Sequence, residues 1–197
     1  MNRTAKISTL FLMLLVFIFV LNAWSREAVF ILRSSEVSDG GTLPAEFTGD
    51  GASATLPLAW SGIPAGTRSC TLIMHHIDPK GKTKWYWTLY NIPANVQSLA
   101  KNVQGVGTLG NNSINKRAEY APPHSKGPGP KTYIYTIYAL SSTLQFSEPP
   151  DQVSREVLLD TMKGHILASA ELRVVYSRPD GTAIKTNNNF PSLNPEQ

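Results

Sequence analysis

The sequence predicts a mostly-β domain, a sandwich or barrel of short strands, with one helix close to its C-terminus. Short segments rich in aromatic and β-branched residues alternate with turn-forming Gly, Pro and Asn along most of the chain. Near the C-terminus, a segment with helical spacing of apolar residues precedes one in which apolar and polar residues alternate. The length of 197 residues suits a single domain with short appendages.

The first 25 residues have the features of a secretory signal peptide. Arg3 and Lys6 form a basic start, residues 7–21 are uncharged and almost entirely apolar, and small residues precede a cut between Ser25 and Arg26. An uncleaved anchor helix is the alternative, although this apolar stretch is shorter than the roughly 20 residues that span a bilayer. We therefore expect a secreted or periplasmic protein with no stable membrane span after cleavage.

Composition excludes several classes of protein. Removing residues 1–25 takes away two of the eighteen basic residues and none of the fourteen acidic ones, which leaves a net charge of +2. The remainder has no basic stripe, so no nucleic-acid partner is expected. The single cysteine, Cys70, excludes an internal disulfide framework and a cysteine-built zinc site, and its apolar neighbours predict a packed thiol.

The first half of the domain contains the clearest strand signals. The segment 69–76 is apolar on both faces, with Leu72 and Met74 on one side and Ile73 on the other, as expected of a central strand covered on both sides. Turn signals such as Asp39-Gly40-Gly41 separate it from its neighbours. The strands predicted in this half are 29–32, 56–60, 69–76 and 85–92.

The second half begins with a long segment, 101–131, that lacks a core pattern and that we expect to form a functional loop. A strand is predicted at 132–140. A helix is predicted between the breakers at Pro149-Pro150-Asp151 and Gly164, followed by a strand at 166–176 whose even-numbered residues form one buried face. The polar, Pro- and Asn-rich residues 179–197 predict a disordered tail.

Six motifs, in a fixed order, resemble the phosphatidylethanolamine-binding protein family, in particular its bacterial Raf-kinase-inhibitor-like branch. They are Gly40-Gly41-x-Leu43-Pro44, Thr48-Gly49-Asp50-Gly51, Leu58-Ala-Trp60-Ser61-Gly62-Ile-Pro64-x-Gly66-Thr67, Trp87-Thr-Leu-Tyr90-Asn91-Ile92-Pro93, Tyr133-x-x-Thr136-x-Tyr138-Ala139-Leu140 and Gly164-His165-Ile166-Leu167-Ala168. The resemblance implies a Greek-key sandwich of two antiparallel sheets with a helix near the C-terminus, and a single domain over residues 26–178.

The resemblance also implies a small pocket at one end of the sandwich that binds phosphate or a phospholipid headgroup. This chain departs from the family there: His76 replaces a pocket aspartate, Tyr86 a histidine and Lys131 a histidine, while Asp78 matches the family's second aspartate. The ligand-binding residues expected from the alignment are His76, Asp78, Tyr86, Trp87, Pro123, His124, Lys131 and Tyr133.

The chemistry of three of these residues favours an anion. His76 ends one predicted strand, Tyr86 begins the next and Lys131 enters a third, so one cluster would hold an imidazole, a phenol and an ammonium group. These groups suit a phosphate or carboxylate through charge-assisted hydrogen bonds, and no cofactor is implied. In a purely structural alternative, His76 and Tyr86 hydrogen-bond to each other at a strand end. The nearby lysines Lys80, Lys82 and Lys84 either form a solvated turn or steer an acidic ligand or membrane headgroup.

Three other functions stay open. His76 and His124 could bind zinc or copper, whereas the adjacent His75 would point to the opposite face of its strand. Catalysis by His76, Asp78 and Tyr86 is less favoured, because neither an activated nucleophile nor a glycine-rich phosphate loop is recognisable. Peptidase inhibition occurs in the wider family, so a protein partner is also compatible with the sequence.

Overall fold

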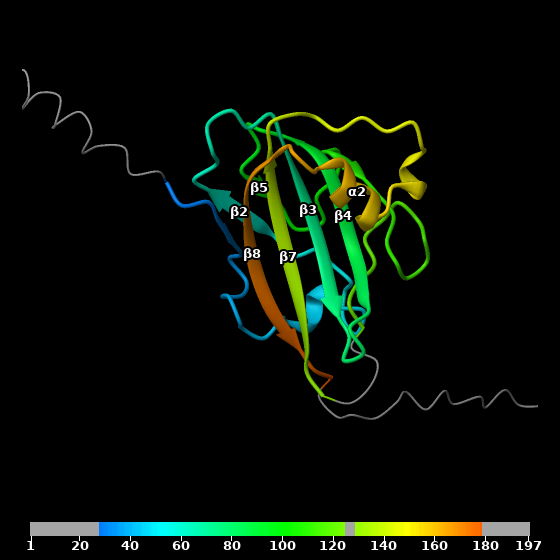
Figure 1. The fold of residues 1–197 in the computed structure, drawn as a ribbon. Coiled ribbons are helices and arrows are strands. Elements are labelled where there is room, and N and C mark those ends of the chain that lie inside the picture. The colour runs from blue at the N-terminus through cyan, green and yellow to red at the C-terminus, as the bar shows by residue number, and fades with distance from the viewer. Residues whose placement is uncertain (1–27, 125–128, 179–197) are drawn as a thin grey trace, which may run out of the picture.

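The structure, a computed structural model, describes residues 28–124 and 129–178 (Figure 1). The predicted signal peptide at 1–25 and the predicted tail at 179–197 lie outside the described residues, and both stay predictions. Within the described part of the chain, no helix is long and apolar enough to cross a membrane.

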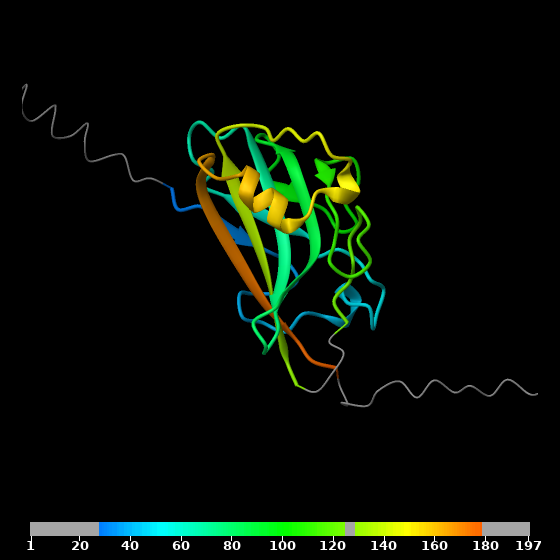
Figure 2. The same ribbon diagram turned by 45° about the vertical axis from the view of Figure 1, so that its right-hand side comes forward.

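Two antiparallel sheets pack against each other, and one short helix covers the outer face of the larger sheet (Figures 1 and 2). The smaller sheet has the order β1 (Ile31–Arg33), β2 (Leu58–Ser61) and β5 (Ser98–Leu99). The larger has the order β6 (Thr108–Leu109), β4 (Thr83–Pro93), β3 (Ser69–Ile77), β7 (Lys131–Leu140) and β8 (Ile166–Tyr176). The helices are the 3-10 turns η1 (Ala45–Phe47) and η2 (Pro150–Gln152) and the α-helix α2 (Arg155–Thr161). The predicted mostly-β, two-sheet fold with one short helix is confirmed.

Strand β3 lies in the middle of the larger sheet, between β4 and β7, as its two apolar faces predict. Leu72 and Met74 belong to the core between the two sheets, and the Cys70 thiol is fully buried beside them. Burial raises the pKa of Cys70 to about 11, as expected of a packed thiol. Ile73 faces the opposite side, where it joins a second core beneath α2.

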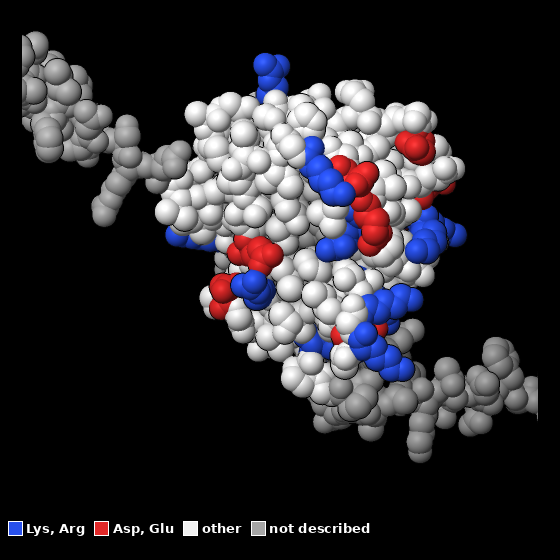
Figure 3. Space-filling view, viewed as in Figure 1, with Lys and Arg blue, Asp and Glu red and all other residues white. Residues whose placement is uncertain are grey.

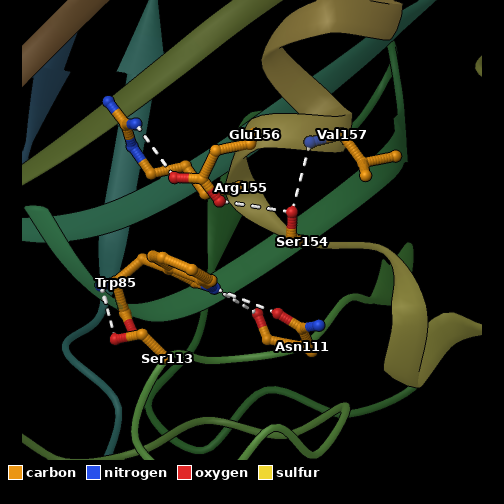
Figure 4. Close-up of polar contacts among 7 residues, drawn as sticks. All are labelled: Trp85, Asn111, Ser113, Ser154, Arg155, Glu156 and Val157. Atoms are coloured by element: carbon orange, nitrogen blue, oxygen red, sulfur yellow. Dashed lines mark hydrogen bonds and ion pairs between the residues drawn. The ribbon is translucent and has the colours of Figure 1, made fainter.

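Helix α2 is held by a cap and by apolar contacts. The Ser154 side chain accepts a hydrogen bond from the backbone N–H of Val157, which stabilises the first turn (Figure 4). Leu158 and Met162 are fully buried against Ile73 of β3. The helix therefore covers the outer face of β3.

The first residues of β8 differ from the prediction. The regular alternation predicts a buried Ile166, but this side chain is 42% exposed. A register shift explains the difference: Ala139 pairs with Ala168, yet Leu140 pairs with Ile166. With regular pairing, Leu140 would lie opposite Leu167. Because Ile166 takes this place instead, its side chain lies on the other face of the sheet from the one predicted.

Residues 101–124, the described part of the predicted loop before β7, are ordered by polar contacts rather than by a core pattern. Asn112 is fully buried, and its side-chain amide donates hydrogen bonds to the carbonyls of Arg117 and Glu119. The Trp85 indole N–H donates to both oxygens of Asn111, which ties this segment to β4 (Figure 4). The described part of the expected loop is therefore folded, and it contributes the short strand β6.

Candidate functional site

The end of β3 and the beginnings of β4 and β7 meet at one end of the larger sheet, the lower end in Figure 1. His76 is paired with Lys84 of β4, and Lys131 is paired with Tyr176 at the end of β8. The structure therefore brings His76, Tyr86, Lys131 and Tyr133 to the same end of the sandwich.

His76 is 7% exposed and held in a defined orientation. Its Nδ1 lies 2.9 Å from the carbonyl oxygen of Thr132. Because a carbonyl oxygen only accepts hydrogen bonds, Nδ1 is the donor in this contact, and Nε2 is left to face the site. The ring centroid is 5.5 Å from that of Tyr133.

Two tyrosines from neighbouring strands form the apolar body of the site. The Tyr86 and Tyr133 rings pack edge to face, with centroids 5.4 Å apart, and their hydroxyl groups are hydrogen-bonded to each other. Burial raises the pKa of both phenols above the ordinary tyrosine value. Both therefore stay neutral at physiological pH and offer O–H groups rather than negative charge.

Positive charge gathers at the same end. Lys131 is half-buried, and this burial is the main cause that lowers the pKa of its ammonium group. The nearby charges of Lys84 and Arg178 lower the pKa of Lys131 further. Both neighbouring cations repel the Lys131 ammonium group, which indicates that positive charge is concentrated at this end. Lys and Arg side chains also gather beside the turn between β3 and β4 (Figure 3), where Lys80 and Lys82 are exposed.

Asp50 and Arg178 belong to this end of the molecule and were not predicted. Arg178 Nε donates to both carboxylate oxygens of Asp50, at 2.9 and 2.8 Å, and the Tyr176 hydroxyl donates to the same carboxylate at 3.0 Å. The Arg178 hydrogen bonds hold the pKa of Asp50 below its usual value. The Thr48-Gly49-Asp50-Gly51 motif marked the turn, but nothing in the spacing linked it to an arginine 128 residues away.

Pro123 and His124 dock on the same turn. The N–H of Gly49 donates to the Pro123 carbonyl at 2.9 Å. The His124 ring lies so close to Gly49 that a Cβ there would be 1.9 Å from Cε1 of the imidazole. The charge of His124 also contributes to lowering the pKa of Asp50, so the two side chains are neighbours. Residues 125–128 of the predicted loop lie outside the described residues.

The two remaining candidates have evident structural roles. Trp87 is 1% exposed, and its ring meets that of Tyr120 edge to face with centroids 5.5 Å apart. Asp78 Oδ1 accepts hydrogen bonds from the backbone N–H groups of Lys80 and Lys82, each at 2.9 Å, which organises the turn between β3 and β4. A ligand-binding role for either residue stays a prediction.

The alternative metal site at His76 and His124 stays a prediction. Within residues 28–124 and 129–178, no group of three or more His, Cys, Asp or Glu side chains is placed to hold a metal ion. His76 continues the face of Met74, between the sheets, whereas His75 continues the face of Ile73, on the side of α2.

His75 makes stability depend on pH. Burial, and then the charge of Arg155, lowers the pKa of His75 to about 4. An unfolded histidine gains its proton near pH 6.5, so the free energy of unfolding falls as the pH drops from about 6.5 towards 4. Between pH 7 and pH 4.5, we expect this residue alone to cost about 2 to 3 kcal/mol.

Urea unfolding at the two pH values measures this effect, with His75→Gln as the variant that cannot titrate there. The wild type should lose more stability than the variant over this range. Equal losses in the two proteins would show that His75 stays exposed to water and titrates normally.

The comparisons with known proteins agree with the fold. The family model described as phosphatidylethanolamine-binding protein matches residues 33–177, which is most of the chain. The chain belongs to this family. A UPF0098 protein of Methanothermobacter thermautotrophicus is 32% identical over 151 residues, covering 75% of this chain and 98% of the relative. YbcL of Escherichia coli is 30% identical over 169 residues, covering 77% and 90%.

The relatives and the solved structures together place the chain in the bacterial YbhB/YbcL branch of this family. A crystal structure of a family homologue from Chlamydia trachomatis superposes with a TM-score of 0.71 at 29% identity, covering 77% of this chain and 99% of the other. That of Escherichia coli YbcL, described as a member of the mammalian family, superposes with a TM-score of 0.66 at 26% identity, covering 76% and 98%. The family and fold predicted from the motifs are therefore confirmed.

Proposed function

We propose that this protein is an exported binding protein whose ligand carries a phosphate group, either a free phosphate compound or a phospholipid headgroup. The observation that carries the proposal is the cluster of cations formed by Lys131, Lys84 and Arg178 beside the buried ring of His76. An anion at this point would offset the charges of Lys84 and Arg178, which act after burial in lowering the pKa of Lys131. Charge-assisted hydrogen bonds to a phosphate are among the stronger polar contacts in proteins.

The substitutions relative to the family support the same class of ligand. Where the family has a pocket aspartate, this chain has His76, which removes a negative charge from the site. The Asp50 carboxylate, which the sequence analysis did not place at the site, already accepts hydrogen bonds from Arg178 and Tyr176. Asp50 and Arg178 offset each other's charge, which leaves Lys131 and Lys84 against the single carboxylate of Asp78, so the balance of charge at the site is positive and favours anions over cations. Export is proposed from the apolar segment 7–21 and its basic start.

A thermal-shift screen of the protein purified after export tests the proposal. Phosphate, phosphoethanolamine, sulfate, zinc and copper are compared at matched ionic strength. A ligand present at 100 times its Kd stabilises the folded state by about 2.7 kcal/mol, which raises the Tm measurably. We expect stabilisation by the phosphate compounds. Stabilisation by zinc or copper alone would instead assign the site to a metal, and an unchanged Tm with every ligand would leave a protein partner as the better interpretation.

A further inference from the structure

An uncharged groove opens at the upper end of the sandwich in Figure 1, beside the first described residues of the chain. Its volume is about 430 Å³, and it is lined by residues 28–30 and 62–65 and by Leu167 and Ala168 at the start of β8. None of these residues carries a charge. Two large apolar side chains in its wall reach solvent, since Val29 is 75% exposed and Leu167 is 43% exposed. The surface beside the start of the described chain is uncharged over a broad area in Figure 3.

A basic side chain flanks the groove. Arg68 stands just before β3 at this end, and its N–H donates to the carbonyl of Leu140, which pairs with Ile166. Arg68 is exposed and makes no ion pair within the described part of the chain. Lys163 also lies at this end, but it is paired with Asp160, and the two charges offset each other. An apolar surface with a cation at its rim suits a partner that presents apolar groups beside negative charge.

The sequence that precedes the groove brings this end of the domain to a membrane. Residues 7–21 are uncharged and almost entirely apolar, and only the six residues 22–27 join them to Ala28 in the groove wall. Six residues span at most about 20 Å. While the segment 7–21 lies in a bilayer, before cleavage or as an uncleaved anchor, this end is therefore held next to the membrane surface. A bilayer with anionic lipids offers the expected chemistry, an apolar layer beneath negatively charged headgroups.

We propose that the upper end of the sandwich is a surface that docks on a bilayer containing anionic lipids. Val29 and Leu167 enter the apolar layer, and Arg68 contacts the phosphates of the headgroups. Strand β8 has 11 residues and is about 35 Å long, and it separates this surface from Lys131, which pairs with Tyr176 at the other end. A docked molecule thus presents its phosphate site to the solution, and the two sites can be tested independently.

Vesicle sedimentation tests this surface with the chain from Arg26 onward, the expected mature protein. The longer chain is unsuitable, because the segment 7–21 would bind any bilayer by itself. Leu167→Ser removes an apolar side chain from the groove, and Ile114→Ser is the matched control, because Ile114 is 50% exposed and does not line the groove. We expect the mature protein to bind vesicles of phosphatidylcholine and phosphatidylglycerol. Leu167→Ser should bind them at least about tenfold more weakly, and Ile114→Ser should bind like wild type.

Arg68→Gln separates the charge from the apolar contact. Its matched control is Arg117→Gln, because Arg117 is also exposed and does not line the groove. We expect Arg68→Gln to weaken binding to the mixed vesicles about fivefold and to leave binding to pure phosphatidylcholine unchanged. Inorganic phosphate, added at matched ionic strength, should not release the protein from the vesicles, because its proposed site lies at the other end of β8.

Amide hydrogen exchange of wild type provides a measurement that does not depend on the folding of a variant. Vesicles should slow exchange in residues 28–30 and 62–65 and leave the start of β7 unchanged. No binding to the mixed vesicles, equal binding by Leu167→Ser and Ile114→Ser, or release by phosphate would each overturn the proposal. A protein that stays off vesicles but forms a dimer, which Leu167→Ser dissociates, would assign this surface to a second copy of the chain instead.

Discussion

Replacing Lys131 with glutamine should weaken phosphate binding between about tenfold and a hundredfold. Lys131 enters the site at the start of β7, where Lys84 and Arg178 add to its positive field. A hydrogen bond to a charged group contributes about 1.5–3 kcal/mol, and each 1.4 kcal/mol is a factor of ten in Kd. Isothermal titration with phosphate measures the change directly.

Lys163→Gln is the matched control for this experiment. Lys163 is an exposed lysine paired with Asp160, just before the start of β8, and thus at the other end of the sheet. The Lys163→Gln variant loses the same unit of positive charge as Lys131→Gln, but at a position far from the site. Its affinity for phosphate should therefore stay close to that of wild type. Equal weakening in the two variants would mean that phosphate responds only to net charge and that Lys131 has no specific role.

Gly51→Ala should lower the free energy of unfolding by about 1 to 3 kcal/mol and disturb the anion site as well. A Cβ at this position would lie 2.2 Å from the carbonyl oxygen of Ala45, and this backbone atom cannot move aside as a side chain can. The turn that must shift carries Asp50, which binds Arg178 and Tyr176. Urea unfolding measures the loss of stability.

Gly105→Ala separates this clash from the general effect of replacing glycine. Gly105 has a φ of +72° and open space around its Cα, so an alanine there meets only backbone strain, about 1 kcal/mol. Its cost should be smaller than that of Gly51→Ala, and its phosphate affinity should be unchanged. If Gly51→Ala were as stable as wild type, the turn at 48–51 would not hold Asp50 rigidly.

The long strands were predictable because their patterns are local. The two apolar faces of 69–76 and the aromatic and β-branched content of 132–140 appear directly in the sequence, and the structure places strands there. The strands β5 and β6 have two residues each, too few to show any periodicity. Asn112 orders its segment through side-chain hydrogen bonds, which leave no apolar pattern to detect.

The site was predictable only in part, for a related reason. His76, Tyr86 and Lys131 lie at or near the ends of their strands, so the expected sheet was enough to bring them together. Asp50 and Arg178 meet only because the turn after η1 lies against the end of β8, a contact set by the tertiary fold. Asp78 matches the family motif, yet both hydrogen bonds described for its carboxylate organise its own turn.

The central claim is that the end of the sandwich around His76, Tyr133 and Lys131 binds a phosphate group. A phosphate titration of the isotope-labelled protein, followed by amide and imidazole chemical shifts in NMR spectra, tests it most directly. We predict saturable shifts confined to the end of β3, the starts of β4 and β7, and the turn at 48–51. Saturable shifts centred elsewhere, for instance beneath α2, or none at this end of the sheet, would contradict the claim.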